Sequence, residues 1–283
     1  MMKTKLNWWK TILSCIALLI IFLAVAFLSD IATKWMSNRS IRFAVREIVL
    51  RLPLTLYLMK LFVTKVLKMK ISTFNIRKSC TQCTKWLIVG MIISLVFLFA
   101  TLVLNELDFM YKRDSYSSKW IVYFVVSTIA MAINGGILEE TLFRGYIMGL
   151  VREKWNTKVA IILPSMIFGL MHLTMINSFN IMDILFLFFG GTMVGIMFSL
   201  IVIKTNNVCY ASIVHFVWNI FFAGKILKIS HLPFDDMNAI FCFKLKSQNL
   251  FLNGGNFGIE VSAIAILIYI GVSLILLKKK AIN

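Results

Sequence analysis

Long runs of apolar residues, separated by short polar and basic stretches, dominate the chain. Two of these runs, TILSCIALLIIFLAVAFLS (11–29) and WLIVGMIISLVFLFATLVL (86–104), contain no charged residue. A helix needs about 20 predominantly apolar residues to cross the hydrocarbon core of a bilayer. Because a spanning segment must satisfy its own backbone hydrogen bonds, such runs predict transmembrane helices. The whole pattern predicts eight spans, at about 11–29, 43–66, 86–104, 119–152, 158–176, 184–203, 208–224 and 258–277.

The second predicted span, 43–66, is the weakest, because it carries several charged residues and a proline. Glu47 and Arg51 stand four residues apart and can pair on one helix face. A helix lying in the membrane interface is the alternative interpretation of this segment. The first span follows three lysines and is longer than the apolar region of a signal peptide, so we expect it to stay uncleaved.

Composition supports a membrane protein. Apolar residues make up 60% of the 283 positions, and the mean hydropathy is +0.87, whereas soluble domains are about 45–50% apolar. The chain shows no internal repeats, low-complexity tracts or long linkers. The predicted fold class is therefore all-α, a polytopic transmembrane bundle of about eight helices that forms one integral membrane domain over residues 1–283.

The net charge of +18, from 30 Lys and Arg against 12 Asp and Glu, would suggest nucleic acid as the partner of a soluble protein. Basic residues also gather in cytoplasmic loops and contact anionic lipid, and that explanation fits an apolar chain better. With both termini in the cytoplasm, eight crossings place the most basic loops inside. We therefore predict a multi-pass protein of the cell membrane whose partner is the lipid bilayer and not nucleic acid.

The five cysteines do not form a disulfide framework. Cys80 and Cys83 make a lone CxxC in a basic loop, with no second pair or histidine near them in the sequence, while Cys15 and Cys209 lie in apolar stretches. The pattern gives little support to a metal or redox role.

Six polar residues stand out within the later predicted spans, where ionisable groups are costly and face partners, water or a site. A helix rises about 1.5 Å per residue, so the depth of a residue can be estimated from its distance in sequence to the nearest basic residue at the inner interface. By this estimate Glu139, His172 and His215 lie about 20, 21 and 16 Å below that interface. These depths agree near the middle of a core about 30 Å thick, which predicts one shared polar cavity. The six residues are Glu139, Glu140, Arg144, His172, His215 and Asn219.

Spacing assigns these residues to helix faces. Glu140 and Arg144 are four apart and within reach of a salt bridge, whereas Glu139 is rotated by about 100° and faces elsewhere. His215 and Asn219 share a face in the same way, as do Phe168 and His172. A carboxylate with an imidazole can activate a water molecule, and His with Asn can donate to an oxyanion. Together they would hydrolyse an amide without a serine or cysteine nucleophile.

Structural roles are the alternative for these residues. A Glu–Arg pair inside a bundle can be a clamp, and a membrane histidine can join helices. The fourth span is also too long for one straight crossing. Gly135-Gly136 precedes the acids, so we expect a break or kink there, with a helix N-terminus close to Glu139.

Three motifs, Glu139-Glu140-Thr-Leu-Phe-Arg144, Phe168-Gly-Leu-Met-His172 and His215-Phe-Val-Trp-Asn219, resemble the signature of the CPBP intramembrane proteases. That family includes the CAAX prenyl endopeptidases and bacterial proteins of bacteriocin processing or self-immunity. The resemblance covers about residues 125–225, the expected catalytic core. It implies that Glu139 and His172 activate water, that His215 and Asn219 stabilise the oxyanion, and that Glu140, Arg144 and Phe168 support the site.

The resemblance leaves the metal question open. Glu139, His172 and His215 could supply a zinc site with an open position, but there is no HExxH motif, and we favour a mechanism with no required cofactor. The enzyme would thus be a CPBP-type peptide hydrolase, either glutamate-type or metal-dependent.

The favoured hypothesis is an intramembrane endopeptidase that cuts a membrane-associated peptide or protein, of the bacteriocin or signal-peptide precursor type. The family branch points to a bacterium, where a prenylated CAAX substrate is not expected. The alternative is a bacteriocin self-immunity protein that acts by binding or shielding. A proton-relay transporter is disfavoured, because transporters often show repeated halves.

Overall fold

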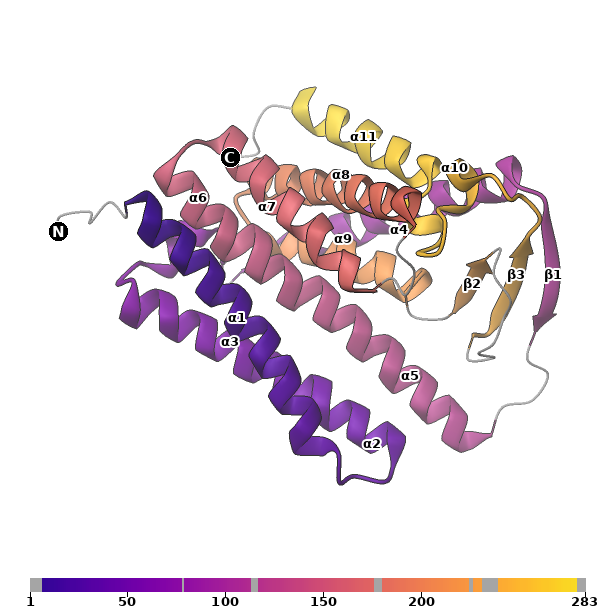
Figure 1. Cartoon of the computed structure of the whole chain (residues 1–283), viewed down its shortest axis with the longest axis horizontal. Helices are drawn as coiled ribbons and strands as arrows, with labels where there is room; N and C mark the ends of the chain where they lie inside the picture. The colour runs from indigo at the N-terminus through magenta and orange to yellow at the C-terminus, as the bar shows by residue number, and fades with distance from the viewer. Residues whose placement is uncertain are drawn as a thin grey trace.

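A computed structural model describes residues 7–77, 79–112, 117–175, 180–223, 226–230 and 239–278. Helices dominate it, and a small sheet lies at one end (Figure 1). The strands are β1 (Leu107–Lys112), β2 (Leu227–Ser230) and β3 (Phe241–Leu245). The helices are α1 (Trp8–Thr33), α2 (Arg39–Ala44), η1 (Val45–Arg51), α3 (Leu52–Leu61), η2 (Phe62–Val66), η3 (Ile71–Phe74), α4 (Cys83–Leu104), α5 (Ser118–Ile133), η4 (Asn134–Glu139), η5 (Thr141–Ile147), α6 (Met148–Lys154), α7 (Thr157–His172), η6 (Leu173–Met175), α8 (Ile181–Thr205), α9 (Val208–Phe221), α10 (Leu250–Asn253), η7 (Ile259–Val261) and α11 (Ala263–Lys278).

Within the described residues, helices cover each of the eight predicted spans. Five are long and apolar enough to cross a membrane: Trp8–Thr33, Cys83–Leu104, Ser118–Lys154, Thr157–Met175 and Ile181–Thr205. The apolar helices α9 and α11 are shorter, and residues 39–66 form one more continuous helical segment. The predicted fold class, a polytopic helical bundle in a multi-pass membrane protein, is confirmed.

Asparagine and serine side chains begin many of these helices. Each cap accepts a hydrogen bond from a backbone N–H of the first turn, which would otherwise have no partner. In a membrane protein, caps of this kind fix where a helix starts at the edge of the bilayer. The capping residues include Asn7 for α1, Ser117 for α5, Asn156 for α7, Asn180 for α8 and Asn207 for α9.

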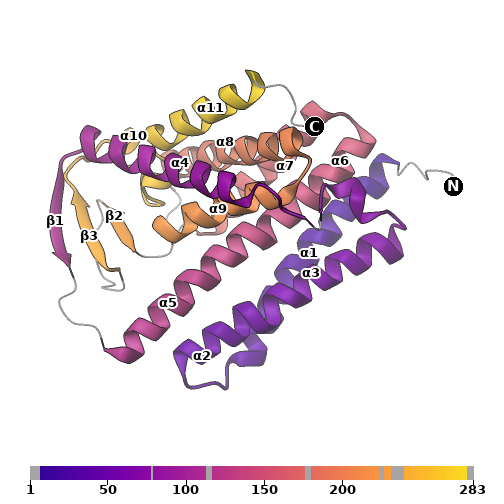
Figure 2. The same cartoon turned by 180° about the vertical axis from the view of Figure 1, so that it is seen from behind.

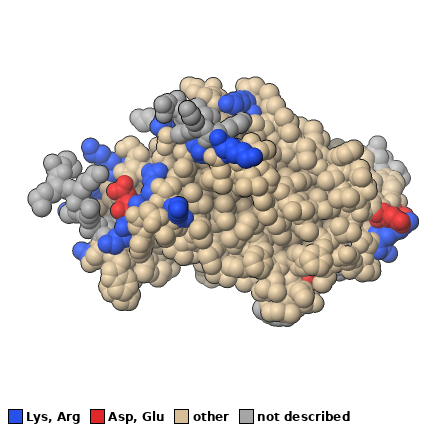
Figure 3. Space-filling model, turned by 90° about the horizontal axis from the view of Figure 1, so that it is seen from above, with Lys and Arg blue, Asp and Glu red and all other residues tan. Residues whose placement is uncertain are grey.

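The molecular surface matches a bilayer environment. Large apolar side chains such as Phe27 on α1 and Phe99 on α4 are exposed. Figure 3 shows Lys and Arg gathered toward one end, with acidic and basic residues together at the opposite end and almost no charge between them. An uncharged belt bounded by charged ends is what a spanning protein presents to lipid.

The second segment, residues 39–66, packs along one side of the bundle. It lies beside α1 in both views (Figures 1 and 2) and also contacts α5. Glu47 is buried and accepts hydrogen bonds from Arg46, Arg51 and Asn134. Three of the charged residues that weakened the prediction of this span thus pair with one another. Through Asn134, Glu47 also binds the long helix that carries the acidic motif.

The sheet was not predicted from the sequence. β3 lies between the other two strands, antiparallel to β1 and parallel to β2. Lys246 Nζ contacts Asp108 Oδ1 at 3.1 Å, and this hydrogen bond raises the pKa of the exposed Lys246 ammonium. Both views place the sheet at the end of the molecule opposite the start of α1 (Figures 1 and 2).

Candidate active site

The acidic motif lies on a continuous helix that runs from Ser118 to Lys154. The helix does not break at Gly135-Gly136, which was one of the two predicted outcomes, because Ile133, Asn134 and Glu140 all keep right-handed helical backbone angles. The helix instead widens into the π-helical turns η4 and η5. Such turns accommodate extra residues without ending the helix and are frequent at functional sites. Glu139 thus has no separate helix N-terminus beside it.

The two glycines allow η4 to lie directly against α9. A Cβ atom on Gly136 would lie 2.7 Å from the carbonyl oxygen of Ser212. A Cβ atom on Gly135 would overlap the side-chain amide of Asn219 and lie 3.5 Å from His215 Nε2. The glycines therefore serve close helix–helix contact, and they bring the acidic motif beside His215 and Asn219.

Glu140 is the centre of a buried ionic cluster. Its Oε1 atom accepts hydrogen bonds from Arg144 Nη1 at 3.0 Å and from His215 Nδ1 at 2.9 Å. Glu140 and Arg144 are 0% and 1% exposed, respectively. The carboxylate thus joins η5 to α9 and fixes the orientation of the His215 ring. The salt bridge suggested by the four-residue spacing is present, and His215 is a further partner.

Aromatic rings surround the Arg144 guanidinium. Its Cζ atom lies 4.3 Å from the centre of the Phe168 ring and 5.4 Å from that of Phe198. Within the described residues, its Nε and Nη2 atoms have no hydrogen-bond partner. Contact with the faces of these rings supplies part of the stabilisation that a buried cation requires. Phe168 thereby has the supporting position that the motif implied.

His172 ends α7 beside the same ring. Its Nδ1 atom lies 2.8 Å from the backbone oxygen of Phe168, and the two ring centres are 4.3 Å apart. A carbonyl oxygen only accepts, so Nδ1 carries the hydrogen and Nε2 of the neutral ring keeps a free lone pair. Phe168 is also 6.5 Å from the His215 ring, centre to centre. One phenylalanine therefore lies beside both histidines, on different helices.

Glu139 differs from its neighbour in its surroundings. It is half-buried, and it lies close enough to Arg144 for an electrostatic interaction. In the described part of the chain it makes no hydrogen bond and no ion pair at contact distance. Asn219 is half-buried as well, beside Gly135. The carboxylate of Glu139 and the amide of Asn219 are both available to a bound molecule.

The chemistry of Glu139, His172 and His215 suits zinc, since each ring uses Nδ1 in a hydrogen bond and could bind a metal through Nε2. Among the described residues, however, their ligand atoms are not part of any group of three that lies within 4.8 Å. The three side chains do not converge as a zinc site in this conformation, and we derive no step through a metal.

Glu260 was not among the predicted site residues. Its carboxylate accepts a hydrogen bond of 2.7 Å from Trp218 Nε1, and its backbone oxygen accepts one of 3.1 Å from the Tyr269 hydroxyl. It interacts electrostatically with His215 and borders a hollow of about 310 Å³ that Phe222 and β2 also line. The sequence did contain a signal for this residue, because Glu260 is an ionisable group at the start of the last predicted span.

Residues 120–221 match the family model described as type II CAAX prenyl endopeptidase, Rce1-like. No curated protein and no solved structure matches the chain. The matched segment contains all three motifs, and it confirms the resemblance to the CPBP family. Residues 120–221 are thus similar to the Rce1-like CAAX prenyl endopeptidases, and this similarity suggests a CAAX-type intramembrane protease.

Proposed function

Because residues 120–221 match the Rce1-like family model, we propose that the protein is an intramembrane endopeptidase. Its substrate is a membrane-associated peptide or protein of the bacteriocin or signal-peptide precursor type. Glu139 and His172 activate the attacking water, and His215 with Asn219 stabilises the oxyanion. Glu140, Arg144 and Phe168 hold these groups in place. No metal is required in this mechanism, since side chains alone perform each step.

The difference between the two adjacent acids carries this proposal. Glu140 is fully buried and bonded to both Arg144 and His215. Glu139, one residue earlier, is half-buried and unpaired among the described residues. A carboxylate needed only for structure would be paired, because an unpaired charge inside a membrane protein is costly. An unpaired carboxylate one residue away from the acid that binds His215 is suited to hold and deprotonate water.

The proposed reaction starts with a water molecule between Glu139 and the Nε2 lone pair of His172. Its oxygen attacks the carbonyl carbon of the scissile bond while its proton passes to the Glu139 carboxylate. The same proton then moves to the leaving amine as the carbon–nitrogen bond breaks. The protein is unchanged at the end, and the products are a carboxylic acid and an amine.

His215 and Asn219 act on the oxygen of the tetrahedral intermediate. Because His215 Nδ1 donates to Glu140, its Nε2 can donate only when the ring is doubly protonated. The buried Glu140 carboxylate stabilises that positive charge. Asn219 supplies a second donor from its amide nitrogen, on the same side of α9. Loss of one such donor lowers kcat by about 10²–10³-fold in other hydrolases.

The cell membrane is the proposed location, with both termini in the cytoplasm of a bacterium. The inner ends of the helices would then carry the basic residues, in accordance with the preference of cytoplasmic loops for Lys and Arg. The proposed partners are the lipid bilayer and a peptide or protein substrate that is already held in it.

The test compares cells that express the wild type with cells that express Glu139→Gln at matched membrane levels. Membrane-associated peptides are quantified by mass spectrometry, and Glu106→Gln, an exposed acid near the sheet, is the matched control. We expect one or a few precursors to accumulate with Glu139→Gln and their cleaved forms to disappear. Glu106→Gln should process them normally.

A protein that acted by binding or shielding would behave differently. Glu139→Gln would then keep the peptide profile and any protection from a secreted peptide toxin, and the proposal of hydrolysis would be overturned. If Glu139→Gln were missing from the membrane, the same comparison is made with His172→Ala and Asn219→Ala, of which at least one must reach wild-type levels and lose processing.

A further inference from the structure

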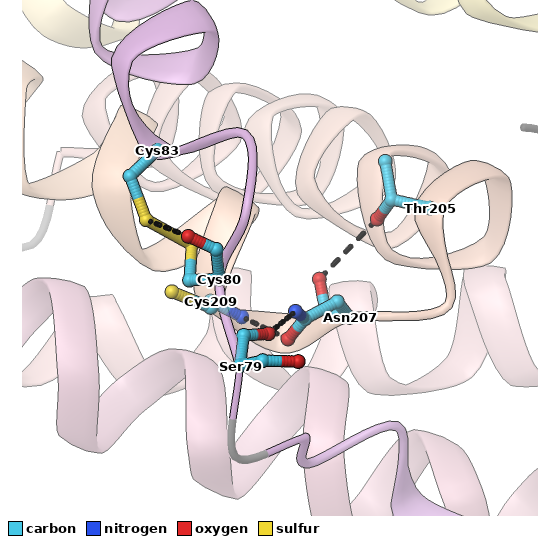
Figure 4. The surroundings of a disulfide bond; sticks show 6 residues. All are labelled: Ser79, Cys80, Cys83, Thr205, Asn207 and Cys209. Atoms are coloured by element: carbon cyan, nitrogen blue, oxygen red, sulfur yellow. Dashed lines mark hydrogen bonds between the residues drawn. A yellow bond between two sulfur atoms is a disulfide. The ribbon is translucent and has the colours of Figure 1, made fainter.

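Three thiols from distant parts of the sequence meet at the start of α9. The Sγ atoms of Cys80, Cys83 and Cys209 lie within 4.8 Å of one another, and all three residues are half-buried. Figure 4 shows Cys209 turned toward the Cys80–Cys83 pair, which a disulfide joins. The sequence placed Cys209 in an apolar run far from the CxxC motif, so the third thiol was not apparent from the spacing.

We propose that these three cysteines, when reduced, form a binding site for a thiophilic divalent metal ion such as Zn²⁺. Zinc binds thiolates at about 2.3 Å, so two sulfur atoms on one ion are less than about 4.6 Å apart. The three sulfurs already lie close to this range. Small movements of the Cys80 and Cys83 side chains would place all three sulfur atoms around one metal ion. The fourth coordination position would then be left for a water molecule or an outside ligand.

Hydrogen bonds unrelated to sulfur hold the two parts of the site together. Asn207 Nδ2 donates to the Ser79 backbone oxygen at 3.0 Å, and Val208 N donates to the Asn75 backbone oxygen at 3.0 Å. Asn207 also caps α9 through the backbone N–H of Cys209, as Figure 4 shows. The loop is thus fixed against α9 whatever the state of the thiols, which reduces the cost of bringing the ligands together.

Two of the three cysteines lie at the start of a helix. Cys83 is the first residue of α4, and Cys209 is the second residue of α9. Basic residues also flank the CxxC in the chain, among them Arg77 and Lys85.

The site is proposed for the reducing side of the membrane. With the N-terminus in the cytoplasm, the loop between the second segment and α4 is cytoplasmic, where disulfides rarely persist and CxxC pairs more often bind metal or carry out catalysis. A cellular dithiol supplies two electrons and two protons to the Cys80–Cys83 disulfide and is itself oxidised to a disulfide. Zinc then binds the three thiols and displaces their protons.

A metal ion at this site would link α9, which carries His215 and Asn219, to α4. Cys209 lies six residues before His215 on α9, so an ion at the three thiols would tie the start of that helix to α4. This proposal does not depend on the proposed hydrolysis. It concerns the stability of α9 and not a catalytic step.

The experiment uses the full chain, purified in detergent and reduced in the absence of oxygen. One sample is loaded with Co²⁺ as a spectroscopic probe, and another is loaded with Zn²⁺ to measure the number of bound ions per chain. We expect one equivalent of metal per chain and a sulfur-to-cobalt charge-transfer band in the near ultraviolet. Zn²⁺ should also raise the Tm. The Cys209→Ser variant and the Cys80→Ser/Cys83→Ser double variant should lose the band and the zinc-dependent rise in Tm.

Two controls separate this site from other metal ligands. Cys15 and Cys242 are buried and unpaired, so Cys15→Ala and Cys242→Ala should keep the bound ion. His172→Ala/His215→Ala should also keep it, since those residues belong to the catalytic site. The proposal is overturned if the reduced wild type shows no sulfur-to-cobalt band, or if Cys209→Ser retains it. An ion that is lost only with the histidines would also overturn it.

Discussion

Glu139 and Glu140 are neighbours in the chain, yet their carboxylates have opposite environments. Glu140 accepts two hydrogen bonds in a fully buried cluster, and Glu139 is half-buried and unpaired among the described residues. A rotation of about 100° per residue separates adjacent side chains on a helix. The motif thus places a fully buried acid directly beside a half-buried one.

Replacing Glu140 by Gln should damage folding, because it removes the negative partner of a buried cation. Breaking a buried ion pair in this way costs about 3–5 kcal/mol, so Glu140→Gln should lower both the Tm in detergent and the amount in the membrane. Glu139→Gln should leave the Tm close to that of the wild type, since no partner loses a bond.

Thermal unfolding of the two purified variants, measured beside their activity, distinguishes these roles. Equal loss of stability in Glu139→Gln and Glu140→Gln would contradict the division between the acids. An unchanged Tm for Glu140→Gln would show that Arg144 does not depend on it.

Glu260 shows how a residue outside the motifs can influence the site. It binds Trp218, which directly precedes Asn219, and its negative charge acts on His215. Glu140 and Glu260 therefore both lie close to His215, on different elements of the bundle. We infer that Glu260 helps to fix the part of α9 that carries His215 and Asn219.

At the scale of elements, the contact between η4 and α9 determines the geometry of the site. Gly135→Ala would place a methyl group on the Asn219 amide, so we expect activity to fall by about tenfold or more, or about 1.4 kcal/mol in the activation free energy. Gly271→Ala on α11 is the matched control, because nothing lies within 4 Å of the added atom.

The control should be neutral or slightly stabilising, since Ala is a better helix former than Gly by about 1 kcal/mol. Activity and Tm are measured for both variants. If Gly135→Ala is as active as Gly271→Ala, then close approach of η4 to α9 is not needed for the reaction.

The helical spans could be predicted from the sequence, because the length of an apolar run reflects the thickness of the bilayer. The four-residue spacings also identified the Glu140–Arg144 pair. The π-helical turns could not be predicted, since the same glycines permit either a break or close packing against another helix. The sheet joins short strands far apart in sequence, and the meeting of Cys209 with Cys80 depends on how whole helices pack.

At the scale of the whole molecule, the two ends differ in charge and in structure. Basic residues gather toward one end, and the sheet occupies the end opposite the start of α1 (Figures 1 and 3). The preference of cytoplasmic loops for Lys and Arg then predicts that the sheet lies outside the cytoplasm. The thiol cluster follows the second segment and would lie inside, so its proposed reducing environment depends on that segment crossing the membrane.

Single cysteines on either side of the second segment test that crossing. Ser37 and Ser72 are exposed and flank the helices of residues 39–66. In a background with all five native cysteines replaced, Ser37→Cys should react with a membrane-impermeant maleimide in intact cells. Ser72→Cys should react only after the membrane is opened. If both react from outside, the segment lies in the interface as first considered, and every later helix is inverted. If only Ser72→Cys reacts from outside, the segment crosses in the opposite direction, and the thiol cluster faces an oxidising compartment.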